Sequence, residues 1–136
     1  MKGRLLGLAL CVTLALTLLT GCGASAPKIV SLTVTDRVEE KTKAPGPAVE
    51  RFPTTATRFY AVARVAGGVK DTKVRTRWFL DDKLIDETEV VFDKAGTRWV
   101  AFSLTTSDGK PFPAGSYKVQ VFLDGAAGPN ANFKVE

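Results

Sequence analysis

The stretch KVRTRWFLDDKLIDETEVVF, residues 73–92, is typical of two strands joined by a tight turn. Its first half separates two sets of side chains. The first set is Val74, Thr76, Trp78 and Leu80, and the second is Lys73, Arg75, Arg77 and Phe79. Because successive side chains of a strand point to opposite faces, this alternation predicts a strand over 73–80 with one face in the core. Asp81-Asp82 then predicts the turn into a second strand over 83–92.

Similar alternating segments recur on both sides of this stretch, with turn residues between them. The further predicted strands are 28–35, 57–66, 97–105, 116–123 and 132–136. Because about seven strands have one apolar face each, the sequence predicts an all-β fold, a single antiparallel sandwich of two sheets. Residues 36–53 are charged and contain three prolines, which predicts a long loop that is either mobile or functional.

Two features of these strands carry a resemblance to a known fold. Trp78 is placed like the buried tryptophan of immunoglobulin-like and fibronectin type III-like domains, and PFPAGSYKVQVFLDG (111–125) resembles the run into their penultimate strand. The resemblance implies an immunoglobulin-like sandwich over 28–136, in which the Tyr117 hydroxyl bonds back to the preceding loop. No cysteine pair joins the sheets, which excludes an antibody-type domain with an inter-sheet disulfide. The motifs specify architecture and leave the function open.

The N-terminal segment has the three regions of a secretory signal peptide. Lys2 and Arg4 precede an apolar stretch, no charge occurs from Leu5 to Pro27, and small residues follow the stretch. An uncleaved transmembrane anchor is the alternative, because about 18 apolar residues can span a bilayer. The glycines, threonines and proline at the far end of the segment favour cleavage.

Leu19-Thr20-Gly21-Cys22 resembles the bacterial lipobox. The resemblance implies a signal peptide over 1–21, cleavage after Gly21, and lipid on the sulfur and the new amino group of Cys22, followed by a tether over 22–27. Two or more acyl chains hold a protein firmly at a membrane. The protein is therefore expected at the cell membrane or outer membrane, facing the extracytoplasmic side. A disulfide is not expected, because Cys11 lies within the signal.

Composition excludes several kinds of site. The chain has no histidine, so Ser-His and Cys-His nucleophile pairs are absent. Zinc-ligand spacing, a phosphate-binding glycine loop and a G-x-S-x-G elbow are also absent, and we expect no cofactor. Loss of Lys2 and Arg4 lowers the formal charge of +5 by two, a mild excess that fits anionic lipid or wall polymers and does not predict nucleic-acid binding.

A run of carboxylates allows two interpretations. Asp81, Asp82, Asp86, Glu87 and Glu89 are close in sequence. They would form either a calcium site, which needs six to eight converging oxygens, or turn residues and a solvated strand face. We favour the second interpretation and expect no metal. An envelope enzyme that uses carboxylates, for example on glycans, is the alternative to a non-catalytic module.

The outward sides of 73–80 and 116–123 form the candidate binding face. In an immunoglobulin-like topology these strands are neighbours, which gathers Arg75, Arg77, Phe79, Lys118 and Phe122. Such a face would bind an envelope protein, an anionic polymer or a glycan. In the alternative interpretation, a two-residue turn places Arg77 opposite Asp86 and Phe79 opposite Leu84, and the face is neutralised surface. Trp99, which points outward if Val100 points inward, and the 36–53 loop are the next candidates.

Overall fold

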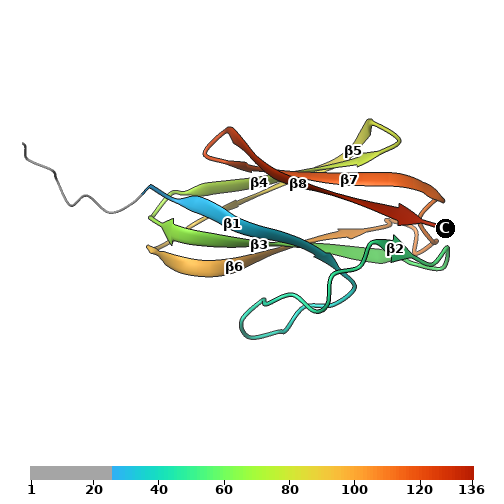
Figure 1. Cartoon of the computed structure of the whole chain (residues 1–136), viewed down its shortest axis with the longest axis horizontal. Coiled ribbons are helices and arrows are strands. Elements are labelled where there is room, and N and C mark those ends of the chain that lie inside the picture. Colours follow the sequence, from blue (N-terminus) through green and yellow to red (C-terminus); the bar gives the residue numbers. More distant parts are fainter. Residues whose placement is uncertain (1–25) are drawn as a thin grey trace, which may run out of the picture.

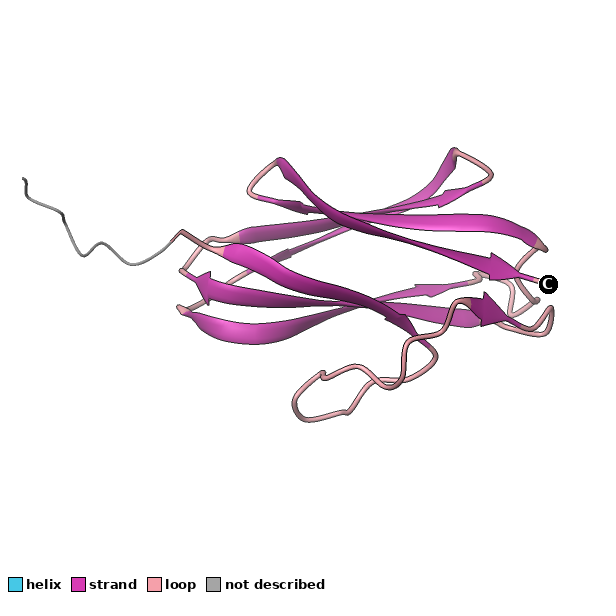
Figure 2. Cartoon of the chain, in the orientation of Figure 1, coloured by secondary structure: helices cyan, strands magenta, loops and turns pink. Residues whose placement is uncertain are grey.

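The computed structural model describes residues 26–136, which form two β-sheets packed face to face (Figures 1 and 2). The strands are β1 (Lys28–Thr35), β2 (Arg51–Phe52), β3 (Arg58–Gly68), β4 (Lys73–Leu80), β5 (Lys83–Val91), β6 (Gly96–Thr105), β7 (Gly115–Leu123) and β8 (Ala126–Val135). The predicted signal peptide and the predicted lipidation site at Cys22 lie outside the described residues. Within residues 26–136, no helix has the length and apolar character needed to cross a membrane.

The sheets have the strand orders β1-β3-β6 and β2-β8-β7-β4-β5. Between β1 and β2 the chain passes from the first sheet to the second, where β2 pairs parallel with β8. The predicted all-β sandwich is confirmed, with β2 as an additional short strand inside the expected 36–53 loop. Strand β8 begins at Ala126, six residues before the predicted 132, although Gly128 and Pro129 resemble a turn. The Gln120 side-chain amide donates to both of their carbonyls at 2.7 and 3.2 Å and holds this part of the strand.

The β4–β5 hairpin turns at Asp81 and Asp82, whose φ angles are +46° and +67°. Positive φ at both central residues matches the twist of the flanking strands, and aspartate tolerates this conformation better than most residues. Phe79 lies opposite Leu84, as predicted.

The predicted pairing of Arg77 with Asp86 is wrong. The register shifts between Trp78 and Phe79, so Trp78 lies opposite Asp86 and Arg77 lies opposite Glu87. Ile85 is the extra residue of β5 at this irregularity. Because one extra residue reverses which side chains share a face, the shift brings Glu87 to the side of Arg77.

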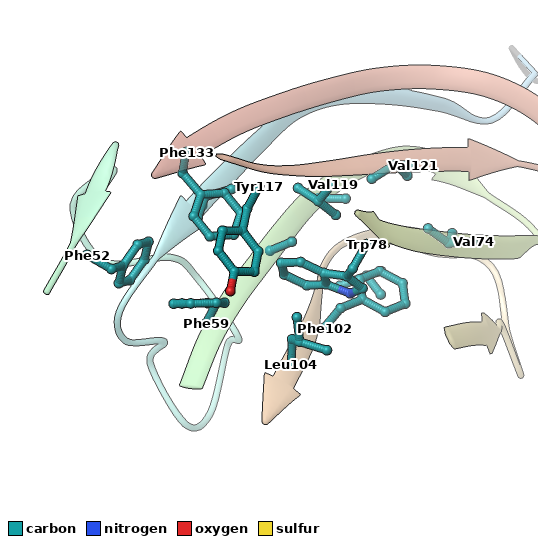
Figure 3. Packing of buried hydrophobic residues seen from close by; sticks show 14 of the residues in the cluster. Phe52, Phe59, Val74, Trp78, Phe102, Leu104, Tyr117, Val119, Val121 and Phe133 are labelled. Carbon is teal, nitrogen blue, oxygen red and sulfur yellow. The ribbon is translucent and has the colours of Figure 1, made fainter. Parts of the chain in front are cut away.

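The core between the sheets is rich in aromatic rings (Figure 3). Trp78 is fully buried and Tyr117 is 1% exposed, as expected from the strand periodicity. The Tyr117 ring stacks on Phe133 with centroids 5.2 Å apart, and its hydroxyl donates to the Pro113 carbonyl at 2.6 Å, which confirms the role implied by the resemblance. Burial, and to a smaller extent the charge of Asp81, raises the pKa of this hydroxyl.

Candidate functional site

The predicted site residues lie on the outer side of the five-stranded sheet, and we call this surface the β4–β7 face. It consists of Arg75, Arg77, Phe79, Lys118 and Phe122. Strands β4 and β7 pair directly, with Arg75 opposite Phe122 and Phe79 opposite Lys118. Their alternate residues Trp78 and Val119 point into the core, so the remaining side chains point outward.

Two cation–ring contacts order the β4–β7 face. The Lys118 ammonium lies 4.8 Å from the centroid of Phe79, and the Arg77 guanidinium lies 5.1 Å from that of Phe122. Both rings are partly exposed. Contacts of this kind contribute about 0.5–1 kcal/mol each at exposed sites. They fix the directions of long side chains that would otherwise sample many rotamers.

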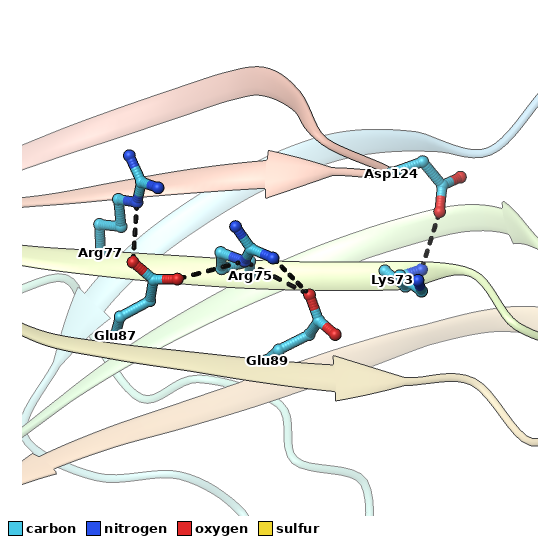
Figure 4. Close-up of polar contacts among 6 residues, drawn as sticks. All are labelled: Lys73, Arg75, Arg77, Glu87, Glu89 and Asp124. Atoms are coloured by element: carbon cyan, nitrogen blue, oxygen red, sulfur yellow. Dashed lines mark hydrogen bonds and ion pairs between the residues drawn. The ribbon is translucent and has the colours of Figure 1, made fainter.

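Two glutamates of β5 pair with the arginines of this face (Figure 4). Arg75 lies 3.1 Å from Glu89 and 3.5 Å from Glu87, and the Arg77 Nε lies 2.9 Å from Glu87. These arginines therefore have carboxylate partners, which agrees with the interpretation of the face as neutralised surface, although the partner of Arg77 is not the predicted one. The terminal nitrogens of Arg77 point away from Glu87 and make no hydrogen bond within residues 26–136.

Two aspartates in turns of the five-stranded sheet have backbone partners. In the β4–β5 turn Asp81 accepts from the Ser116 amide at 3.0 Å, and in the β7–β8 turn Asp124 accepts from the Lys73 amide at 2.9 Å. Within the described part of the chain, no group of three or more histidine, cysteine or acidic residues is placed to hold a metal ion.

A second surface, whose residues were not predicted from the sequence to lie together, is on the outer side of the three-stranded sheet. We call it the β3–β6 face and define it by Arg58, Tyr60, Arg64 and Trp99. The Arg64 guanidinium lies 4.8 Å from the centroid of Trp99. Arg58 donates to the Tyr60 hydroxyl at 3.1 Å. The outward direction of Trp99 agrees with the burial of Val100.

A groove of about 380 Å³ adjoins this second face. It is lined by Val38, Glu40, Lys43, Tyr60, Ala101 and Ser103. Residues 36–46 form one wall as a small hairpin, in which Val38 pairs with Pro45. The Glu39 carboxylate accepts from the Thr42 amide at 2.7 Å, and the Thr42 hydrogen bonds lower the pKa of Glu39. These local bonds shape the expected loop into a defined wall.

Comparisons with known proteins give the fold. The chain matches no protein-family model and no curated protein. It is similar to an immunoglobulin-like protein from Pseudomonas aeruginosa, with 14% identity, a TM-score of 0.53, and coverage of 84% of this chain and 99% of that chain. The CARDB domain of a Pyrococcus furiosus protein has 16% identity and a TM-score of 0.43, over 81% and 94% of the two chains.

An alkylpurine DNA glycosylase from Pseudomonas fluorescens, solved with DNA, has 11% identity and a TM-score of 0.49. The match covers 81% of this chain and only 30% of the glycosylase. At such identities the similarity shows the fold alone. The similarity to the Pseudomonas aeruginosa protein confirms the expected immunoglobulin-like sandwich.

Proposed function

We propose that the protein is a non-catalytic module, anchored by lipid on Cys22 to the extracytoplasmic side of a membrane, which binds an envelope protein through the β4–β7 face. The observation that carries the binding role is the pair of ordered cation–ring contacts on neighbouring strands. Partly exposed aromatic rings and arginines are the residue types that dominate binding energy at protein interfaces. Here they lie on a rigid sheet, so little side-chain entropy is lost on binding.

Apolar surface next to the rings supports a protein partner over a free polymer. Leu84 lies opposite Phe79 and is 48% exposed, and the neighbouring Ile85 is 39% exposed. A partner that covers these side chains gains hydrophobic stabilisation of about 25 cal/mol per Å² of apolar surface buried. The free terminal nitrogens of Arg77 would supply directional hydrogen bonds beside that apolar surface.

The exposed side chains at the end of the sandwich where β1 begins support the proposed membrane anchor. Val30, Val69 and Val91 are 59%, 47% and 49% exposed, and they lie near the start of β1, in the β3–β4 turn and at the end of β5 (Figure 1). Lysines outnumber aspartates at this end, which has Lys28, Lys70, Lys73 and Lys94 against Asp71, Asp93 and Asp124. Apolar side chains among cations suit an anionic bilayer surface. The six residues from Cys22 to Lys28 would keep this end within about 20 Å of the lipid.

The anchor is tested by Cys22→Ser. We expect this variant to keep the mass of the precursor, because lipid transfer to the cysteine precedes cleavage in the lipobox pathway. A Cys22→Ser protein that is processed normally and carries no lipid would contradict the anchor.

The binding role is tested by site-specific photo-crosslinking in intact cells. A photoreactive phenylalanine analogue in place of Phe122 should give a discrete protein adduct, and Arg75→Glu/Arg77→Glu should abolish it. Arg37→Glu/Arg51→Glu is the matched control, because it reverses two exposed ion-paired arginines elsewhere on the domain. An adduct that persists in the first double variant, or that is lost equally in the control, would contradict the role of the β4–β7 face.

A further inference from the structure

We infer that the β3–β6 face is a second binding site, whose ligand is an extended glycan that carries negative groups. This inference does not depend on the proposed protein partner, because it concerns the outer side of the other sheet. It rests on the lack of ion pairs at two arginines within residues 26–136, on the spacing of these arginines along β3, on two partly exposed rings, and on the groove beside Tyr60.

The two arginines of this face differ from all others in residues 26–136. Arg58 and Arg64 have no carboxylate within ion-pair distance in this part of the chain. The remaining arginines, which are Arg37, Arg51, Arg75, Arg77 and Arg98, each pair with an aspartate or glutamate. A guanidinium without a counter-ion keeps the planar donors that bind carboxylate or phosphate in a bidentate way. The β3–β6 face therefore favours an anionic ligand.

The spacing along β3 favours a long ligand over a small ion. Arg58 and Arg64 are six residues apart on one strand, a separation of about 20 Å. The outward positions between them on β3, Tyr60 and Val62, are uncharged, and Val62 is fully covered by its neighbours. A single small anion reaches one guanidinium only, whereas an extended polymer can contact both.

The rings and the groove favour sugar units over an acidic peptide. Tyr60 and Trp99 are partly exposed, and flat rings pack well against the C–H faces of pyranose units. In the groove, Glu40 and Ser103 can accept hydrogen bonds from sugar hydroxyls, and Lys43 can donate one. Glu40 would repel the dense run of carboxylates in an acidic peptide. The side chains of such a peptide also offer few hydrogen-bond donors to the groove. A glycan with spaced acidic groups satisfies both the arginines and the groove.

The groove is formed before any ligand binds. The Glu39 amide donates to the Ala44 carbonyl, the Lys43 amide to the Glu39 carbonyl and the Gly46 amide to the Arg37 carbonyl, each at 2.9 Å. A preformed wall reduces the entropy that binding would otherwise cost.

The test uses the full acylated chain in detergent, with polygalacturonate as the anionic glycan probe. The chain has only two tryptophans, and Trp78 is fully buried, so a change in tryptophan fluorescence reports on Trp99. We expect a saturable change with polygalacturonate and none with neutral dextran. The affinity should fall as salt is raised, because exposed charges are screened. Trp99→Phe should abolish the fluorescence change.

Paired variants locate the site. Arg58→Gln/Arg64→Gln should weaken binding at least about tenfold, a factor that corresponds to about 1.4 kcal/mol. Arg37→Gln/Arg51→Gln removes the same charge from two exposed, ion-paired arginines outside both faces and should bind polygalacturonate as the wild type does. Ser103→Phe, which fills the groove without changing the charge or adding a tryptophan, should also weaken binding. Thermal unfolding monitored by circular dichroism checks that each variant is folded.

Three results would overturn the inference. The first is the absence of saturable binding to polygalacturonate by the wild-type protein. The second is equal affinity for polyglutamate, which would assign the face to acidic peptides. The third is equal weakening by the two arginine pairs, which would show that net charge alone attracts the polymer. None of these results bears on the crosslinking of the β4–β7 face, so the two proposals fail separately.

Discussion

Replacement of Trp78 tests how the core holds the two sheets together. Trp78 is fully buried, and its ring lies 6.2 Å from that of Phe133. A buried tryptophan removes about 200 Å² from water, which at about 25 cal/mol per Å² corresponds to about 5 kcal/mol. Trp78→Ala should therefore lower the free energy of unfolding by about 3–5 kcal/mol, as other large core truncations do. A domain of this size has about 5–15 kcal/mol in total, so the variant should be marginally folded.

The indole nitrogen sharpens this prediction. It is buried without a hydrogen-bond acceptor within residues 26–136. An unpartnered buried donor costs about 1–3 kcal/mol, and phenylalanine does not have one. Trp78→Phe should therefore cost less than half as much as Trp78→Ala, because the smaller ring loses packing but removes the unsatisfied group.

Urea unfolding monitored by circular dichroism measures these differences, since the substitutions alter fluorescence directly. Trp99→Ala is the matched control, because Trp99 is partly exposed on an outer face, and we expect it to cost at most about 1 kcal/mol. An unchanged midpoint for Trp78→Ala, or an equal cost for Trp99→Ala, would refute the assignment of Trp78 to the core. An equal loss of unfolding free energy for Trp78→Phe and Trp78→Ala would refute the argument that the unpartnered indole nitrogen destabilises the fold.

Three further predictions concern stability. Tyr117→Phe should cost about 1 kcal/mol at neutral pH through loss of the bond to Pro113. The raised pKa of Tyr117 stabilises the folded state, and this stabilisation is fully present below about pH 10 and is lost as pH rises through the folded-state pKa. The free energy of unfolding of Tyr117→Phe should therefore fall less in alkali than that of the wild type. A parallel fall in both proteins would contradict this. Arg75→Glu/Arg77→Glu should stay folded but with a lowered melting temperature, because each substitution is at the surface and sets a carboxylate opposite a glutamate of β5; unfolding at room temperature would show a structural role. Gly68→Ala should destabilise by about 1–3 kcal/mol, because its Cβ would lie 2.2 Å from the buried Phe92 ring, and an unchanged midpoint in urea would contradict this clash.

The periodicity of the sequence was sufficient to predict which faces are buried. Strand β4 alternates strictly, so Trp78 could be assigned to the core without knowledge of its neighbours. The hydroxyl bond of Tyr117 was implied by the resemblance of the run before it to immunoglobulin-like domains, and this bond spans only four residues of chain. Local patterns of this kind depend on backbone geometry that the sequence encodes directly.

Pairing across strands was harder to predict. A single extra residue, Ile85, moved the partner of Arg77 from Asp86 to Glu87, and no local residue pattern marked it as irregular. Strand β2 has two residues, too few for any period to appear.

The β3–β6 face was missed for the same reason. The outward positions of Arg64 and Trp99 were each visible in the sequence, but their contact depends on the pairing of β3 with β6 over 35 residues of chain. Long-range register is decided by the fit of whole sheets, which no single segment contains.

The most direct test of the proposed anchored module is the intact mass of the wild-type protein extracted from the membranes of its own cells. The account predicts a chain that begins at Cys22, lacks residues 1–21, and carries additional mass equal to a diacylglyceryl group and one acyl chain. Digestion should place that added mass on the N-terminal peptide. A full-length precursor, or a processed chain without lipid, would contradict the proposal that this domain is held at a membrane through Cys22.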